Sequence, residues 1–323
     1  MAEPNAPWLE FLSTQGINLG SADVHGGMLA ALTHLGVLAV SGTDAENFLH
    51  SQLTNDVLEL TPGAMHLGGY CSPKGRLLAT LLIWKSNDGV MLVIPRELLP
   101  GIQKRLQMFV LRSKVTISDV SEQTVLIGAA VPDLSEIGFS ETDGLNAAWP
   151  SAAGLHRALW MGPVESAMHL WTTLSKTLTP TSASYWRWLD IRAGLPMVVD
   201  ATREQFVPQM VNFDLVGGVN FRKGCYPGQE IVARSQYLGK LKRRMLLAST
   251  QAEAAAAGME IFSEVDPGQP CGLVVNAEKN PEGTWDLLVE IKLEAAQTSV
   301  HLGAAHGQLL QFSELPYVIG DPA

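Results

Sequence analysis

The chain has 323 residues, of which 46% are hydrophobic and 17% are charged. This composition supplies enough apolar side chains for about two packed domains and excludes an intrinsically disordered protein. The formal net charge of -10 argues against a protein that coats nucleic acid, because phosphate binding requires a positive surface. The first residues lack the basic and apolar regions of a signal peptide, and no apolar run approaches the roughly 20 residues of a membrane span. We therefore expect a cytoplasmic protein.

The chain has three cysteines, Cys71, Cys225 and Cys271, which lie far apart in the sequence. An odd number without a CxxC pair excludes a dense disulfide framework and a local zinc or cluster-binding motif. The histidines are scattered, so we expect no protein-borne metal site. GxGxxG, P-loop, HExxH and GxSxG patterns are all absent, which removes the familiar nucleotide-binding and hydrolase interpretations.

The first half of the chain mixes helical and strand patterns. An apolar stripe predicts a helix over 43–54. Residues 76–85 and 90–95 predict the two strands of a hairpin, because an Asn-Asp-Gly turn separates them. An amphipathic pattern over 96–112 predicts a second helix, with Pro100 in its first turn.

The pattern changes after about residue 240. Before that point, strands are expected at 114–120 and 124–130 and helices at 163–178 and 183–196, the last closed by glycine and proline. Beyond it, short strands alternate with turns rich in Gly, Pro and Asn. That spacing predicts a small β-barrel or sandwich.

The segment FRKGCYPGQEIVAR, residues 221–234, combines a thiol with positive charge. Cys225 follows Arg222 and Lys223, and Pro227 suits the first turn of a following helix. Cations and a helix N-terminus stabilise a thiolate, so we expect the pKa of Cys225 to lie below the ordinary value of about 8.5. The alternative is a cysteine that packs inertly, as free cysteines often do.

Basic residues gather around this segment although the protein as a whole is acidic. The cluster is either a solvated charged face or a site for an anionic ligand, and the sequence leaves both interpretations open. Its members are Arg222, Lys223, Arg234, Lys240, Lys242, Arg243 and Arg244.

Residues 206–234 resemble the signature region of the YgfZ family, whose members are folate-binding proteins related to the glycine-cleavage T-protein, an aminomethyltransferase. The string KGCYxGQE at 223–230 is specific to that family. The segments SGTDAENFLHSQLTNDV at 41–57 and GGYCSPKGRLLATLLIW at 68–84 are also similar to it. With the terminal β region included, the resemblance covers residues 20–323.

The resemblance implies an α+β, GcvT-like fold, in which two α/β subdomains and a C-terminal β-barrel form a ring around a central opening. The folate-binding region is expected over 20–240, as two consecutive or interleaved subdomains that divide near residue 120, and the barrel over 241–323. The implied cofactor is tetrahydrofolate or a one-carbon-substituted folate. The implied role is to support assembly or repair of iron–sulfur clusters in enzymes such as a tRNA methylthiotransferase.

The implied partners are reduced folate and iron–sulfur client enzymes or cluster-assembly proteins, with no membrane and no direct binding of RNA. Cys225 and Lys223 are the residues expected to be reactive. The remaining signature positions are Gly224, Tyr226, Gly228, Gln229, Glu230 and Arg234. The residues expected near the folate are Asn55, Asp56, Tyr70, Arg192, Gln209 and Asn212, although Asp56 and Asn212 also suit ordinary capping or turn roles.

Two departures from the T-protein pattern leave its enzymatic activity open. Ala79 and Thr80 stand where T-protein relatives have aspartates, and neither side chain can act as a carboxylate base. Arg192 stands at the position of a glutamate that binds the pterin ring, and a guanidinium has only donors. Either the folate is held differently or another carboxylate, such as Asp190, takes that role. A folate-dependent aminomethyltransferase is therefore the alternative to an accessory protein.

Overall fold

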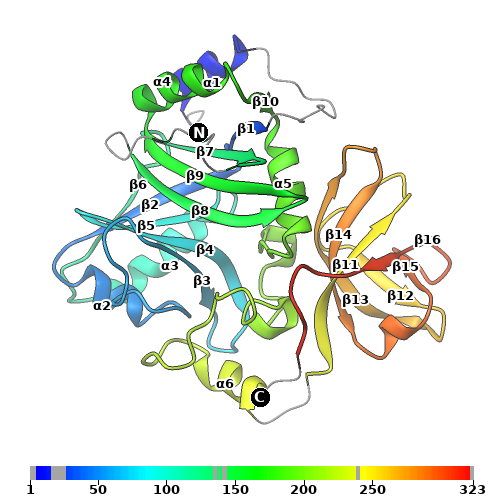
Figure 1. Ribbon diagram of the computed structural model, residues 1–323. Helices are drawn as coiled ribbons and strands as arrows, with labels where there is room; N and C mark the ends of the chain where they lie inside the picture. The colour runs from blue at the N-terminus through cyan, green and yellow to red at the C-terminus, as the bar shows by residue number, and fades with distance from the viewer. Residues whose placement is uncertain are drawn as a thin grey trace.

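The computed structural model describes residues 5–15, 27–133, 137, 139, 144–237 and 241–320. Within these ranges the chain forms three β-sheets, with short helices on their surfaces and between them (Figure 1). The predicted α+β class is confirmed. The predicted division into domains at residues 120 and 240 stays a prediction.

Sheet 1 is antiparallel, with the strand order β3-β4-β5-β2-β6. It contains the predicted hairpin, whose turn places Ser86 opposite Gly89. Helix α2 begins two residues later than the sequence pattern indicated, whereas α3 has a proline in its first turn, as predicted. The elements are β2 (Leu35–Ser41), α2 (Ala45–His50), β3 (Met65–Cys71), β4 (Leu77–Ser86), β5 (Gly89–Pro95), α3 (Leu99–Val110) and β6 (Thr116–Asp119).

Sheet 2 has the order β10-β1-β7-β9-β8 and includes a parallel pair, β1 with β10. The sequence analysis predicted β7 and α4 but not β8 or β9. Two helices, α1 and α4, cover the outer face of this sheet (Figure 1). The elements are α1 (Ala6–Ser13), β1 (Met28–Ala31), β7 (Thr124–Val131), β8 (Leu145–Ala152), β9 (Leu155–Pro163), α4 (Val164–Leu174) and β10 (Thr179–Thr181).

The two sheets stack face to face. Successive side chains of a strand point to opposite faces of its sheet, so each strand of sheet 1 contributes to two buried clusters. Val37 and Trp84 of sheet 1 share one buried cluster with Leu126 of sheet 2. The alternate residues Leu38 and Ile83 pack instead with the helices α2 and α3. The result is a layered helix–sheet–sheet–helix body whose central layer is apolar.

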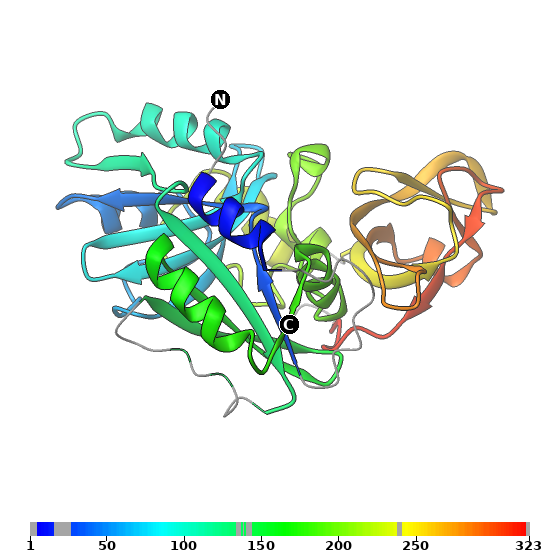
Figure 2. The same ribbon diagram turned by 90° about the horizontal axis from the view of Figure 1, so that it is seen from above.

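Helix α5 (Ala183–Arg192) lies between this body and the barrel (Figure 2). It ends as predicted, with Gly194 at a φ of 66° and a proline two residues later. Trp186 and Asp190 lie one turn apart on one side of the helix, and Trp188 and Arg192 lie on another side. Both tryptophans are buried packing residues.

The predicted barrel is confirmed as an antiparallel, nearly closed sheet in the order β16-β15-β12-β13-β14-β11-β17. Its first and last strands in this order, β16 and β17, are separated by a single residue in the chain, so the two edges of the sheet approach each other. The strands are β11 (Arg243–Thr250), β12 (Glu260–Ser263), β13 (Asp266–Lys279), β14 (Trp285–Lys292), β15 (Val300–Leu302), β16 (Gln308–Leu309) and β17 (Gln311–Ser313).

The signature segment forms a loop followed by α6 (Gln229–Tyr237). The helix begins two residues after Pro227, so the expected position of Pro227 in its first turn is wrong, and Cys225 lies in the preceding loop. Gly228 has a φ of 80°, and a side chain there would collide with Ser72 and Gly75. No helix in the described part of the chain is long and apolar enough to cross a membrane.

Candidate functional site: a central pocket and the signature loop

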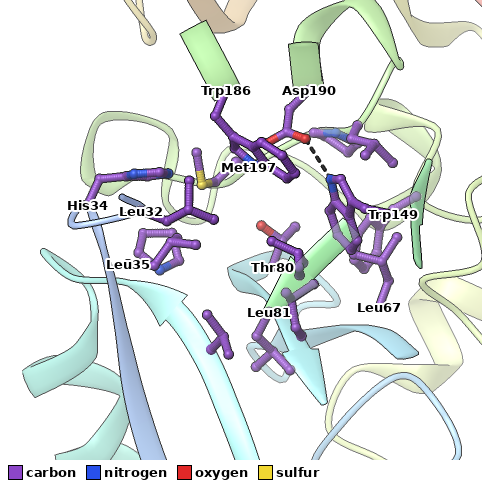
Figure 3. Close-up of a pocket in the computed structure, with 17 residues that line it drawn as sticks. Leu32, His34, Leu35, Leu67, Thr80, Leu81, Trp149, Trp186, Asp190 and Met197 are labelled. Atoms are coloured by element: carbon purple, nitrogen blue, oxygen red, sulfur yellow. Dashed lines mark hydrogen bonds between the residues drawn. The ribbon is translucent and has the colours of Figure 1, made fainter. Parts of the chain in front are cut away.

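A pocket opens in the central layer, between sheet 1 and sheet 2 and beside α5 (Figure 3). Its walls come from the β1–β2 turn, from strands of both sheets, from α5 and from the segment 195–197. They are mainly apolar side chains, with a few polar groups directed into the space, which is the usual design of a small-molecule site. The apolar walls include Leu32, Leu35, Leu67, Leu81, Leu159 and Leu195.

Asp190 supplies a carboxylate to this pocket from α5 (Figure 3). Its Oδ1 accepts hydrogen bonds from Trp149 Nε1 and from the guanidinium of Arg157, both at 2.8 Å. The hydrogen bonds from described residues all use Oδ1, so Oδ2 remains available to a ligand. Burial raises the pKa of the Asp190 carboxyl, and the Arg157 guanidinium partly opposes that shift by favouring the ionised form.

The guanidinium of Arg157 holds the Asp190 carboxylate in place. Its side chain on β9 is fully buried, lies 4.9 Å from the ring of Trp186, and donates through Nε to Pro150 O. Because a buried guanidinium needs a counter-charge, Arg157 and Asp190 each stabilise the other's position. The carboxylate is therefore held in one orientation before any ligand arrives.

Thr80 lies in the pocket at one of the positions where T-protein relatives have an aspartate. Its Oγ1 accepts a hydrogen bond from Val198 N at 3.0 Å, which leaves the hydroxyl proton for a ligand. Ala79, the other such position, is absent from the pocket lining and packs with the helix side of sheet 1. The pocket thus has the Thr80 hydroxyl at a position where T-protein relatives have a carboxylate, and its own carboxylate, Asp190, comes from α5.

His34 is a further polar group of the pocket, in the turn between β1 and β2 (Figure 3). Its Nδ1 is buried and has no hydrogen-bond partner among the described residues. Burial, with smaller contributions from Arg187 and Arg96, lowers the pKa of His34 to about 3. The imidazole is therefore neutral at physiological pH.

The signature loop forms a second, separate locus. Lys223 is 8% exposed, and its ammonium donates to His50 O and to Leu53 O at the end of α2. Burial lowers the pKa of Lys223 to about 8, while the nearby Asp56 and Cys225 side chains oppose the shift. Lys223 therefore anchors the loop that carries Cys225, and the thiol itself is exposed.

His50 lies against this loop, although no histidine is close to Cys225 in sequence. Its Nε2 is 3.4 Å from where a Cβ on Gly224 would be, and its Nδ1 is 3.2 Å from Asp56 Oδ1. The same oxygen of Asp56 accepts from the backbone amides of Leu58 and Glu59. Asp56, which the sequence analysis expected near the folate, thus caps a turn and contacts His50.

The other residues expected near the folate lie outside the pocket lining. Asn55 binds Leu67 O and Gly217 O, so it supports the wall without reaching the space. Gln209 donates to Val232 O, and Asn212 donates to Met245 O. Tyr70 is buried, with the Arg105 guanidinium 6.0 Å from its ring centre.

Arg192 also lies outside the central pocket and lines a polar cleft on another side of α5, next to the barrel. One of its nitrogens is 3.6 Å from Asp286 Oδ2. The residue at the family's glutamate position therefore faces a different space from Asp190, which is only two positions earlier.

Three members of the basic cluster are paired with acceptors. Arg244 forms a two-point ion pair with Asp214, and Arg243 contacts Glu290 at 2.7 Å. Lys223 is bound as described above, and Lys240 lies outside the described residues.

Sequence reasoning did not identify His34, Trp149 or Arg157. These residues come from a turn and from the unpredicted strands β8 and β9, and none belongs to the segments that carry the family resemblance. Within the described ranges, no group of three or more His, Cys, Asp or Glu side chains could hold a metal ion.

The fold is that of the glycine-cleavage T-protein class. The aminomethyltransferase T of the glycine cleavage system from Bartonella henselae matches with a TM-score of 0.64, over 92% of this chain and 88% of that chain. The two sequences are 17% identical, so this likeness shows the fold alone.

In sequence, the chain is similar to the tRNA-modifying protein YgfZ of Klebsiella pneumoniae. The two are 29% identical over 309 residues, which are 91% of this chain and 94% of that protein. No protein-family model matches the chain. The resemblance to the YgfZ family and the GcvT-like fold, both expected from the signature segment, are confirmed by these comparisons.

Proposed function

We propose that this protein is a folate-binding accessory protein with a role linked to tRNA modification, and that the central pocket is its folate site. The observation that carries this proposal is the Asp190 carboxylate, which Arg157 and Trp149 hold inside an apolar pocket. A pterin ring is flat and largely apolar on its faces, and its amino and N–H edge pairs with a carboxylate. Asp190 thereby fills the role that the family gives to a glutamate.

The residues present fit such a ligand. The leucine side chains and Trp149 offer apolar contact to a ring, and Oδ2 of Asp190 is free to accept. Thr80 provides a hydroxyl proton on the opposite wall. When bound, a reduced folate would supply a one-carbon unit or reducing power. The protein's own part is to orient the ring and to exclude water from it.

Cys225 has a different place in the proposal. None of residues 223–230 lines the pocket, and the thiol is exposed on a loop that Lys223 anchors. We assign the thiol to contact with client proteins, namely iron–sulfur enzymes such as a tRNA methylthiotransferase. Its role is to maintain their clusters, with folate bound in the pocket at the same time.

A folate-dependent aminomethyltransferase is the second candidate, because Asp190 does place a carboxylate in the pocket. That carboxylate is already held through one oxygen by Arg157 and Trp149, although burial raises its pKa overall. Thr80 cannot replace it in proton transfer. Purified protein incubated with an aminomethyl donor and tetrahydrofolate should therefore show no turnover. A rate near that of a true T-protein would favour the second candidate.

Calorimetric titration with tetrahydrofolate tests the pocket. The wild type should bind below millimolar concentration, and Asp190→Asn should weaken binding by about tenfold or more, since a charge-assisted hydrogen bond is lost. Arg192→Gln, on the same helix but outside the pocket, is the matched control and should bind like the wild type. No binding by the wild type at millimolar concentration would refute the proposal.

The cellular role needs its own measurement. Methylthiolated nucleosides in tRNA can be quantified in cells that lack this protein and in cells complemented with each variant. We expect restoration by the wild type and by Arg192→Gln, and a reduced level with Asp190→Asn. Full restoration by Asp190→Asn would show that the tRNA-linked role does not depend on ligand binding in the pocket.

A further inference from the structure

The lining of the central pocket includes a side chain with a buried polar atom that the folded protein leaves unsatisfied. His34 Nδ1 is buried without a hydrogen-bond partner among the described residues, in a pocket whose walls are otherwise mostly apolar. Figure 3 shows the imidazole extending from the β1–β2 turn toward Met197, at the edge of the space that Asp190 and Thr80 face from other walls. A buried polar nitrogen costs stability unless it is paired, so a ligand is the natural source of its partner.

The backbone that presents this imidazole is held firmly. Arg96, at the end of β5, donates its amide to His34 O at 2.9 Å. Its guanidinium donates to Thr33 O and to Leu35 O, both at 3.1 Å. One side chain therefore binds the turn on either side of His34 and ties it to sheet 1. The imidazole is positioned before binding, as a residue that selects a ligand should be.

The chemistry of the imidazole also suits recognition. Burial, assisted by Arg187 and Arg96, keeps the ring neutral at physiological pH. A neutral imidazole has one N–H donor and one acceptor nitrogen, so it can pair with a donor or an acceptor on a heterocycle. Asp190 can only accept, and the hydroxyl of Thr80 can donate. The three groups together offer a mixed pattern that a simple hydrocarbon could not satisfy.

We propose that His34 is a specificity-determining residue that forms a hydrogen bond with the heterocyclic ring of the bound ligand, opposite the contacts made by Asp190 and Thr80. This inference rests on the proposed folate site and names which part of the ligand the pocket selects. The pterin ring lies in the pocket, and the p-aminobenzoylglutamate tail lies outside the reach of His34.

The test compares three variants of the full chain. His34→Leu removes both ring nitrogens but keeps an apolar side chain, and His34→Gln restores a donor and an acceptor. His66→Leu is the matched control, because His66 also has a buried Nδ1 without a partner but lies outside the pocket lining. Each is titrated with tetrahydrofolate and with a reduced pterin that lacks the tail, and its melting temperature without ligand is recorded.

We expect His34→Leu to weaken binding of both ligands by about tenfold, because one buried hydrogen bond is lost. His34→Gln should recover part of the affinity, and His66→Leu should match the wild type. Without ligand, His34→Leu should be as stable as the wild type or more so, since an unpaired polar atom has been removed from an apolar pocket.

Four results would overturn the inference. Equal affinity of His34→Leu and wild type would refute it while leaving the folate site intact. A clear fall in the melting temperature of unliganded His34→Leu would show that the imidazole serves packing. If His34→Leu loses affinity for tetrahydrofolate but not for the tail-less pterin, His34 contacts the p-aminobenzoylglutamate tail and not the ring. If the wild type binds neither ligand, the proposed folate site fails, and this inference fails with it.

Discussion

Exposure separates Cys225 from the other two cysteines. Cys71 and Cys271 are 0% and 4% exposed, whereas Cys225 is exposed. Burial raises the pKa of the Cys71 thiol to about 12 and raises that of Cys271 as well, so both remain protonated at neutral pH. Only the thiolate reacts readily with alkylating agents.

Iodoacetamide at pH 7 should therefore label Cys225 well before the other two cysteines. Peptide mapping of the native protein by mass spectrometry measures the three rates, and unfolded protein serves as the control in which they should converge. Labelling of Cys71 in the native protein as fast as Cys225 would contradict the buried geometry described above.

The role of that thiol is a separate question, which Cys225→Ser addresses. The change keeps size and polarity at an exposed position, so folding and folate binding should match the wild type. Complemented cells should nevertheless show reduced activity of iron–sulfur enzymes, because the soft nucleophile is gone. Full activity of these enzymes with Cys225→Ser would mean that the thiol is not reactive in the cell.

At this scale the sequence predicted the signature loop better than the pocket. The string KGCYxGQE is contiguous, so a single segment carries it. The pocket instead combines His34 from a turn, Thr80 from a strand and Asp190 from a helix. Their proximity depends on the stacking of two sheets, which no local pattern encodes. Asn55 and Gln209 show the opposite error: they were expected near the ligand, but their side chains donate to backbone carbonyls outside the pocket.

At the scale of elements, the barrel strands β11 and β14 share a buried ion pair with an unusual titration. Glu290 is 2% exposed, and burial raises its pKa to about 7 although Arg243 opposes the shift. In the unfolded chain the value is about 4.3, so folding takes up a proton between these two values. The contribution of this carboxyl to stability is full below about pH 4 and is lost as the pH rises through 7.

Glu290→Gln removes this titration and keeps a hydrogen-bond acceptor for Arg243. Relative to the wild type, the variant should gain roughly 2–3 kcal/mol of stability as the pH rises from 5 to 8. Urea denaturation at both pH values measures the free energy of unfolding. A difference between variant and wild type that is constant across this range would mean that Glu290 is ionised throughout.

Elements were predictable where their patterns are regular. The hairpin β4–β5 combines alternating apolar residues with a short turn, and α3 carries an apolar stripe after Pro100. Strand β8 was missed because its residues are mostly half-buried or exposed, so the apolar alternation of a strand is weak. The start of α6 was misplaced because Gly228, with its positive φ, separates Pro227 from the helix.

At the scale of the whole molecule, Arg244 joins the barrel to the segment before the signature loop. Its guanidinium binds Asp214 through two contacts and also donates to Gln209 O, and both charged side chains are nearly inaccessible to solvent. Removing one member leaves the other as an unpaired buried charge, which costs about 3–5 kcal/mol.

Arg244→Met should therefore lower the free energy of unfolding by about that amount. The double variant Arg244→Met with Asp214→Leu should recover a large part of it, because no unpaired charge remains. Chemical denaturation of the two variants and of Asp214→Leu alone completes the cycle. Additive effects of the two single changes would show that the residues do not act as a pair.

The barrel edges described earlier also bear on the order in which the protein is made. Strands β16 and β17 occupy the two edges of the barrel, and only Leu310 separates them in the chain. Tyr317, a few residues further on, donates to Gly194 O at the end of α5. Synthesis proceeds from the N-terminus, so β11 and β15 lack their edge partners, and the contact of Tyr317 with Gly194 is missing, until residues 308–317 have left the ribosome. Until then the nascent chain exposes unpaired strand edges that could pair with other chains. This last short stretch therefore sets the moment at which the newly made protein becomes safe from aggregation.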